Sequence, residues 1–419
     1  VTGDVIITSG TVTIEPGTIV KFATSNDNIV YGSSSQIWIQ VMLDGALRAV
    51  GDSTNWITFT TTSFLPGKGA WGGIAYTVLN NDSANIMKYC IIEYANTGFD
   101  ISNPQGNAAE PSAPIFENCV IREISGSGVY GNAGASPTFR RCVFHDCSAG
   151  MFLHGCDNPV IEYTYVYNVS TGLVFPGNPY PSDSPVYLNS PVINHVTIYN
   201  VNMMLTDNPK WWTGYAIYPC NDPTDITLTN SIISNPTLYG YKLQSGGTSN
   251  HNYNCWNGGL GAIEGGTIGA NSIEQDPMFY DPANGDLRLD ESSPCIGAAS
   301  DGSNMGAWQG GAMPGPPQTG IQNNLLLSNN SGDITITNNP NPFIEKTTIQ
   351  VKGIKVNSFS KKARIYNLQG KLIKTLGLNS NKIVWDATDE QGQRVAPGVY
   401  VFNLNFANHL YQRNIIVAQ

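Results

Sequence analysis

The 419-residue sequence predicts an all-β protein, in which a parallel β-solenoid with about three strands per coil is followed by a small antiparallel β-sandwich. Three observations predict this fold. One short apolar pattern recurs through the first part of the chain, and no amphipathic helical window of useful length occurs before about residue 300. From about residue 336 the sequence changes to alternating strands with regular turns, which is typical of a sandwich.

The recurring pattern is an apolar residue, two polar residues, a Cys, Thr or Val anchor, and another apolar residue two positions after the anchor. The five anchors are Cys90, Cys119, Cys142, Thr164 and Val196. A strand that recurs every ~20–30 residues must stack on its neighbours, because one copy cannot bury its own apolar face. Over roughly residues 1–310 the chain resembles right-handed parallel β-helix proteins. This resemblance leaves function open, because the fold occurs in lyases, glycosidases, adhesins and inert surface proteins.

We expect three regions along the chain. Residues 1–313 form the β-helix, with an entry cap in residues 1–22 and closing coils from Asp276 to about Trp308. Residues 314–335 are a linker, and residues 336–419 form an Ig-like β-sandwich. Irregular insertions are predicted at about 99–114, 173–190 and 202–224. Insertions at coil corners usually gather on one side of a solenoid and build the binding site.

The last ~80 residues carry a series of short motifs in a fixed order. They are Asn339-Pro340-Asn341-Pro342-Phe343, Ala363-Arg364-Ile365-Tyr366-Asn367-Leu368-Gln369-Gly370, Trp385-Asp386, Asp389-Glu390-Gln391-Gly392 and Pro397-Gly398-Val399-Tyr400. In order and spacing these motifs resemble type A sorting domains of the type IX secretion system. The resemblance implies the type IX secretion machinery as a partner, and a protein that is secreted or held at the outer cell surface. In that family the domain is commonly removed after export.

Charge is sparse and unevenly distributed. Charged residues make up 12% of the chain, and its net charge is −10. Residues 336–419 hold 11 Lys/Arg against 4 Asp/Glu, a net of +7, so the rest of the chain carries −17. An acidic solenoid argues against nucleic acid as a partner. No run of ~18 apolar residues occurs, so no membrane span is expected, and we expect the start at Val1 to be that of a mature form.

Eight cysteines lie in the predicted solenoid. Cys90, Cys119 and Cys142 share one repeat position, which indicates an inward stack of free thiols that act as small apolar residues. Cys220 and Cys255 lie in loop-like sequence and are the better candidates for a disulfide. No zinc spacing is present and no cofactor is expected. Calcium binding by the aspartates of the closing segment is an alternative to solvated turn carboxylates; these aspartates are Asp276, Asp281, Asp286 and Asp290.

Strand alternation assigns the candidate binding face. If the anchor and the residue two later point inward, the residues one and three later point outward. The outward candidates from these two columns are Glu93, Arg122, His145, Tyr165, Tyr167 and Tyr199. The corner residue just before each anchor adds Arg141 and Tyr163. Tyr rings stack on sugar faces and Arg forks bind carboxylates, so this face predicts a groove for saccharide, including acidic sugars. The alternative is ordinary strand decoration, because Tyr and Thr favour exposed strand positions.

A second candidate lies in the insertion around Trp211 and Trp212. These aromatic residues could form a platform against sugar, or they could pin the loop onto the solenoid.

The leading hypothesis is a secreted or cell-surface protein that binds extracellular polysaccharide. The first alternative is a polysaccharide lyase or glycoside hydrolase of the same fold. In a lyase, Arg122 or Arg141 would neutralise the sugar carboxylate, and His145 or Tyr167 would remove the proton. A hydrolase needs paired carboxylates, and Glu93 stands alone in its column. The second alternative is a structural or adhesive protein that binds protein or associates with itself.

Overall fold

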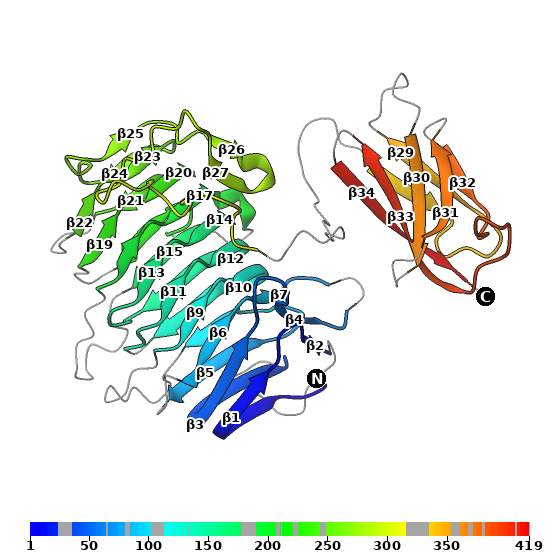
Figure 1. The fold of residues 1–419 in the computed structure, drawn as a ribbon, viewed down its shortest axis with the longest axis horizontal. Helices are drawn as coiled ribbons and strands as arrows, with labels where there is room; N and C mark the ends of the chain where they lie inside the picture. Colours follow the sequence, from blue (N-terminus) through cyan, green and yellow to red (C-terminus); the bar gives the residue numbers. More distant parts are fainter. Residues whose placement is uncertain are drawn as a thin grey trace. The chain divides into compact units, whose positions relative to one another are not determined.

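The computed structural model describes residues 1–23, 36–63, 66–79, 84–101, 113–132, 134–176, 190–206, 210, 212–220, 225–243, 249–315, 335–352, 361–367, 372–378, 382–406 and 409–418. The chain divides into two compact units, residues 1–317 and 318–419. The first unit is a parallel β-helix and the second is built from small antiparallel sheets, as the sequence predicts (Figure 1).

Each coil of the solenoid contributes one strand to each of three parallel sheets. The first sheet contains β2 (Ile19–Phe22), β4 (Ile57–Thr61), β7 (Cys90–Glu93), the first parts of β10 (Val120–Asn132) and β12 (Val143–His154), β14 (Tyr165–Val169), β17 (Thr197–Val201), β20 (Ile232–Pro236), β23 (Cys255–Asn257) and β25 (Ile273–Glu274).

The other two sheets follow the same coils. The second contains β5 (Gly73–Leu79), β8 (Phe99–Ile101), the later parts of β10 and β12, β15 (Thr171–Pro176), β18 (Ile217–Cys220), β21 (Tyr239–Lys242) and β24 (Gly261–Glu264). The third contains β6 (Ile86–Lys88), β9 (Ile115–Glu117), β11 (Thr138–Arg140), β13 (Val160–Glu162), β16 (Val192–Asn194), β19 (Ile226–Thr229) and β22 (Ser249–Asn252). At the N-terminal end, β1 (Val5–Ile14) and β3 (Trp38–Val50) run through both the second and the third sheet.

Left-handed backbone residues bend the chain on both sides of the first sheet. Those before each strand have φ between 50° and 57°, and they are Tyr89, Asn118, Arg141, Tyr163, His195, Asn230 and Tyr253. Those after it have φ between 52° and 62°, and they are Tyr94, Glu123, Asp146, Asn168, Asn200 and Asn235. Asn tolerates this conformation best among residues with a side chain. Three of these Asn form a ladder, in which Asn200 Nδ2 donates to Asn168 Oδ1 at 2.7 Å and Asn235 Nδ2 donates to Asn200 Oδ1 at 3.4 Å.

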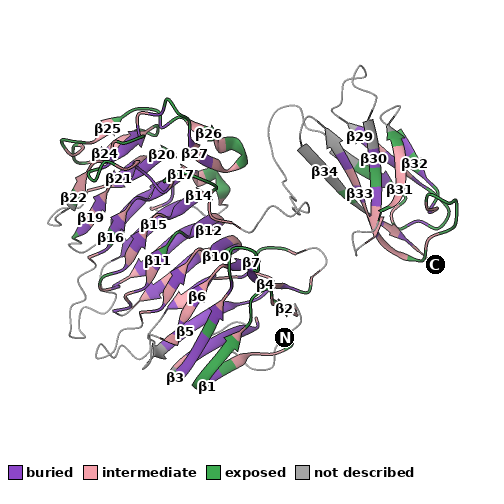
Figure 2. Ribbon diagram, in the orientation of Figure 1, coloured by how far each residue is buried: buried purple, intermediate pink, exposed green. Residues whose placement is uncertain are grey.

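The inward-facing residues form one continuous core along the solenoid (Figure 2). The five repeat anchors are all fully buried, which confirms the predicted inward column, and the cysteines in it are free thiols. Beside it, Phe116 and Phe139 stack with their ring centroids 4.8 Å apart. This spacing matches the separation of neighbouring strands, so identical ring types on successive coils pack face to face.

Residues 276–313, which we call the strap, do not continue the coils. β26 (Phe279–Asp281) and β27 (Asp286–Leu289) pair antiparallel, with a 3-10 turn (η3, Pro282–Asn284) between them. Leu287 and Ala307 of the strap share a buried cluster with Ile91, Val120 and Tyr165, which point outward from the first sheet. The prediction of closing coils is therefore wrong. This outward column of the first sheet is apolar, and the strap removes it from water.

The second unit consists of two antiparallel sheets around a separate core. One sheet has the order β28 (Thr335–Asn339), β29 (Thr347–Lys352), β32 (Lys382–Trp385). The other has the order β31 (Leu372–Leu378), β30 (Lys361–Asn367), β33 (Gly398–Phe406), β34 (His409–Val417). Phe343 and Trp385, both from the predicted motifs, are buried in this core beside Phe402. The Trp385 indole Nε1 donates to the Thr388 carbonyl at 3.0 Å, which holds the turn after β32.

A fragment that ends at Pro317 is expected to unfold in one cooperative transition. Residues 1–317 hold their own core, and the core of the second unit contains no residue of the solenoid. Circular dichroism melting of the fragment and of the full chain measures this. A fragment with strand content but no cooperative melting would show that the solenoid needs the C-terminal unit.

Candidate functional site

The predicted register of the first sheet is confirmed. Arg122 on β10 pairs with His145 on β12, His145 pairs with Tyr167 on β14, and Tyr167 pairs with Tyr199 on β17. Arg122 also pairs with Glu93 on β7. These five side chains therefore form one column across five coils, and each keeps part of its surface outside the core.

The strap covers most of the remaining candidate face. Tyr165 is only 1% exposed, so the prediction that it lies exposed beside Tyr167 and Tyr199 is wrong. Tyr167 and Tyr199 are half-buried. A Cβ on Gly285 of the strap would lie 3.1 Å from the Tyr167 hydroxyl, and the Phe279 ring packs edge-on against Tyr199 at 5.6 Å. The face therefore does not form an open groove over β14 and β17.

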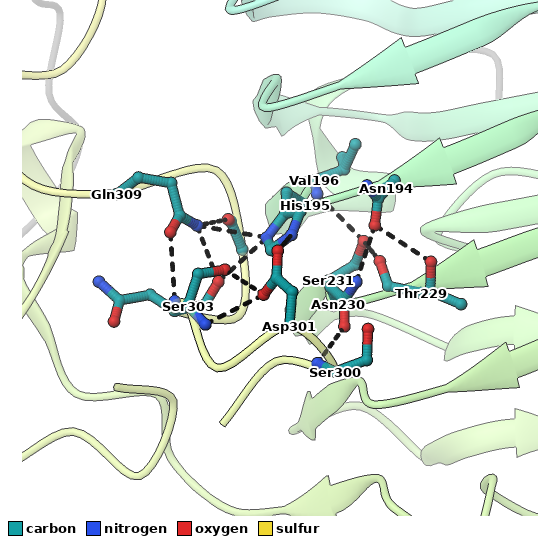
Figure 3. Close-up of polar contacts among 12 residues, drawn as sticks. Asn194, His195, Val196, Thr229, Asn230, Ser231, Ser300, Asp301, Ser303 and Gln309 are labelled. Atoms are coloured by element: carbon teal, nitrogen blue, oxygen red, sulfur yellow. Dashed lines mark hydrogen bonds and ion pairs between the residues drawn. The ribbon is translucent and has the colours of Figure 1, made fainter. Parts of the chain in front are cut away.

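His195, at the corner before β17, is the main polar anchor of the strap (Figure 3). Its Nδ1 lies 3.0 Å from the Asn304 carbonyl oxygen, and its Nε2 lies 3.6 Å from the Asp301 carboxylate. One coil further along, Asn230 Oδ1 accepts a hydrogen bond from the Ser300 amide at 2.8 Å. The corner positions of two successive coils thus hold the strap loop by hydrogen bonds to its backbone.

Arg141 and Tyr163 lie in the same corner column as His195. The Arg141 guanidinium sits 5.6 Å from the Tyr163 ring centroid, and the Tyr163 ring stacks on His195 at 4.9 Å. Arg141 is exposed, whereas Tyr163 is half-buried. The structure thus brings these two predicted residues together, but at the corner where the strap is anchored.

The Glu93 and Arg122 side chains neutralise each other. Arg122 Nε and Nη2 donate to the Glu93 Oε2 atom at 2.9 Å and 2.7 Å, and Thr60 Oγ1 donates to Oε1 at 2.9 Å. The Arg122 side chain keeps 37% of its surface exposed and Glu93 keeps 12%. Because two charge-assisted hydrogen bonds hold the pair together, a sugar carboxylate would have to compete with Glu93 for this guanidinium.

His145 is likewise engaged. Its Nδ1 lies 2.6 Å from the Asp146 carboxylate, and its ring stacks on Tyr167 at 4.9 Å. Burial alone would raise the pKa of Asp146, but the hydrogen bond and charge of His145 lower it. Burial raises the pKa of Tyr167 well above its usual range. Tyr167 is therefore a poor base at neutral pH, because the phenolate is disfavoured in these surroundings.

The outer face of the second sheet carries a row of aromatic side chains that we call the aromatic face. Its members are Tyr130, Phe152, Trp212, Tyr215, Tyr218 and Tyr239. The Phe152 ring stacks on Tyr130 at 5.8 Å and meets Trp212 edge-on at 5.5 Å. Tyr130, Phe152, Trp212 and Tyr239 are half-buried, whereas Tyr215 and Tyr218 are buried.

A polar pair borders the aromatic face at β21 and β24. Lys242 Nζ lies 5.7 Å and 5.5 Å from the ring centroids of Tyr215 and Tyr218, and 3.2 Å from the Glu264 carboxylate. The Tyr215 hydroxyl donates to Glu264 at 2.5 Å. This hydrogen bond lowers the pKa of Glu264, so the carboxylate stays ionised beside the rings. The arrangement offers ring faces together with a cation and an anion.

The position of the aromatic face can be found in the sequence from a recurring glycine. The glycine that recurs after each first-sheet strand opens the second-sheet strand, and a Cβ on Gly150 would lie 2.8 Å from the Gly172 carbonyl oxygen. Two positions after each of these glycines, and after Ala216 and Ala262 at the equivalent places, a side chain points outward in register. The outward column is Asp100, Tyr130, Phe152, Val174, Tyr218, Lys242 and Glu264. The insertion predicted as the second candidate contributes Trp212, Tyr215 and Tyr218 to this face, whereas Tyr130, Phe152 and Tyr239 are not among the predicted residues.

The predicted insertions begin at different corners of the coil. Those at about 99–114 and 173–190 start where β8 and β15 end, which is the same edge of the second sheet. The third, at about 202–224, starts after β17 and contains a 3-10 turn (η2, Met203–Leu205) and β18. Trp211 lies outside the described residues, while Trp212 packs on Phe152.

The aspartates considered for calcium are engaged separately. Asp286 pairs with Arg288 at 2.6 Å, Asp290 accepts from Ser292, and Asp281 accepts from Asn284. Within the part of the chain that the structure describes, no three His, Cys, Asp or Glu side chains gather in a way that could hold a metal ion. In the same residues no helix is long and apolar enough to cross a membrane.

Comparisons with known proteins agree with this architecture. Residues 72–257 match the family model described as "Right handed beta helix region", and residues 339–418 match the one described as "Secretion system C-terminal sorting domain". The chain is thus a right-handed β-helix protein with a type IX secretion sorting domain, and both resemblances seen in the sequence are confirmed. The sorting domain places the protein at the cell surface or in the extracellular space.

One solved structure similar to part of the chain comes from work on PorZ, described as an essential bacterial surface component of the type-IX secretion system of Porphyromonas gingivalis. It is 21% identical, and the match covers 20% of this chain and 11% of that chain with a TM-score of 0.18. The likeness therefore spans only a small part of either protein and carries no argument about function. A comparison with curated proteins finds no match.

Proposed function

We propose that this exported β-helix protein binds extracellular polysaccharide through the aromatic face of the second sheet. The observation that carries the proposal is the row of half-buried rings Tyr130, Phe152 and Trp212. Tyr130 and Phe152 lie on successive coils, and Trp212 packs on Phe152 from the insertion before β18. Aromatic rings stack on the apolar faces of sugars, and a row of rings at strand spacing suits an extended polymer. Lys242 and Glu264 at the border add hydrogen-bonding partners for hydroxyl or charged groups.

This proposal moves the binding site away from the first sheet. The strap buries Tyr165, and Arg122 and His145 already hold Glu93 and Asp146 as partners. A lyase on this face would need a free cation for the sugar carboxylate and an accessible base. Arg122 and His145 do not meet these needs, and the exposed Arg141 lies at the corner, away from both. Binding is therefore better supported than catalysis.

A structural or adhesive role is the second candidate, and the strap is the observation that favours it. A face that the chain covers with its own segment cannot receive a substrate, but it stiffens the solenoid. In this role the partner would be another protein or a second copy. Light scattering on the purified chain, together with the glycan measurement below, separates the two candidates.

The Phe152→Ala variant is expected to weaken polysaccharide binding by about 1 kcal/mol or more, through the loss of ring stacking. Phe152 contacts both Tyr130 and Trp212, so its removal interrupts the row at its centre. A glycan array followed by affinity electrophoresis measures the change. The matched control is Tyr167→Ala on the first sheet, which should leave binding unchanged. Loss of binding in the control alone would return the site to the first sheet, and absence of any glycan binding would favour the structural role.

A further inference from the structure

Cys255 occupies an outward position of the first sheet, in contrast to the cysteines of the core. In the register of the sheet it pairs with Ile232, and Ile232 pairs with Thr197. This column is the one that carries Tyr165, and it points away from the solenoid interior. Cys255 is nonetheless fully buried, because the strap lies over it.

The strap brings a second thiol, that of Cys295, next to Cys255. Cys295 is also fully buried, and the two residues share a cluster with Ile232, Leu289 and Met305. The two thiols lie close enough to interact, and Cys255 Sγ donates to the Gln275 carbonyl at 3.3 Å. The backbone around Cys295 is fixed, because its carbonyl accepts from the Met305 amide at 2.9 Å. The contact therefore joins two segments that are both held in place.

The other stacked cysteines have different surroundings. Cys90, Cys119 and Cys142 point inward on successive coils, where their thiols interact with one another and each also donates to backbone carbonyls around it. They lie in the main core of the solenoid and replace small apolar residues there. Of the free cysteines in the described residues, Cys255 and Cys295 alone bring the strap and the solenoid together.

We propose that Cys255 and Cys295 form a disulfide in the exported protein and thereby lock the strap onto the last coils. The two thiols lose two protons and two electrons as the sulfur–sulfur bond forms. A disulfide-bearing oxidant, such as an envelope thiol oxidase or oxidised glutathione, accepts them and is reduced to two thiols. Exported proteins pass through or reach an oxidising space, where such bonds persist. Of the two disulfide candidates in the sequence, Cys220 and Cys255, this proposal keeps Cys255 and gives it Cys295 as its partner.

The order of folding and oxidation follows from burial. The contact with Cys295 and burial raise the pKa of Cys255, and the thiolate is the form that reacts. Cys255 is therefore slow to oxidise while the strap covers it. The bond forms before the strap closes, or when it opens transiently, and it then holds the closed state.

Alkylation of the full chain, collected outside the cell without reductant, tests this proposal. The protein is denatured in N-ethylmaleimide, and its intact mass and tryptic peptides are measured. We expect two of the eight cysteines to resist alkylation, and a peptide containing Cys255 to be linked to one containing Cys295. Prior reduction should make all eight reactive. A chain with eight reactive thiols, or with Cys255 linked elsewhere, would overturn the proposal.

Two variants complete the design. Cys295→Ser should leave Cys255 reactive with maleimide, whereas Cys119→Ser should keep the linked peptide, because Cys119 lies in the core stack. Should a variant fold poorly, the reduced wild-type chain incubated with oxidised glutathione gives an independent readout. The linked peptide should appear there, and its absence after complete reaction of the oxidant would count against the pairing.

Discussion

Removal of residues 339–418 is expected to leave almost no protein outside the cell. These residues match the sorting domain of the type IX secretion system and form a unit with its own core, so they can be recognised independently of the cargo. The solenoid should stay folded inside the envelope, because its core includes none of the removed residues. Immunoblots of the envelope and the culture medium from a strain that carries the deletion measure the distribution.

A point variant in the sorting domain shows whether export depends on the folded domain or only on the length of the chain. Trp385→Ala removes the largest buried side chain of the sorting domain and should impair export with the full chain present. Val384→Ala alters the neighbouring residue, which is 55% exposed, and should leave export intact. Normal release of the deleted chain would contradict the role of the domain.

The coils and their register were predictable because they repeat. A slip of one residue would turn Arg122 and His145 into the core, and burial of such groups without partners costs several kcal/mol. The inward cysteines follow from the same alternation. The sorting domain was predictable for another reason, since its motifs, such as Asn339–Phe343, stand in a fixed order.

The strap was not predictable from local pattern. Its contacts join residues far apart in sequence, such as Leu287 with Tyr165, and no periodicity marks them. One signal was present. The outward column contains Ile91, Val120 and Val143, and apolar residues on successive outward positions indicate a face that something covers. Tyrosines on such a face suit a packed interface as well as they suit sugar contacts.

The Leu287→Ala variant is expected to destabilise the docked strap by about 2–5 kcal/mol, the usual range for a buried leucine. Leu287 is fully buried in the cluster that also holds Tyr165, so the shorter side chain leaves a cavity between strap and sheet. Hydrogen exchange of the strap amides and limited proteolysis within 276–313 measure the docking, with thermal unfolding as a global readout. Leu260→Ala is the matched control, because Leu260 is 68% exposed and its loss should change stability by less than about 0.5 kcal/mol.

Gly306→Val tests the same contact from the other end of the strap. Gly306 has φ of +82°, and a Cβ there would lie 2.7 Å from both Ile232 Cδ1 and Thr197 Oγ1. The added side chain should push the strap outward and break the hydrogen bond from the Ala307 amide to Thr197 Oγ1, which is 2.9 Å long. Gly315→Val, where a Cβ meets nothing within 4 Å, should have no effect. If Leu287→Ala and Gly306→Val left the strap as protected as in the wild type, the strap could not be what buries the first-sheet face. Tyr165, Tyr167 and Arg122 would then return as candidates for a sugar groove.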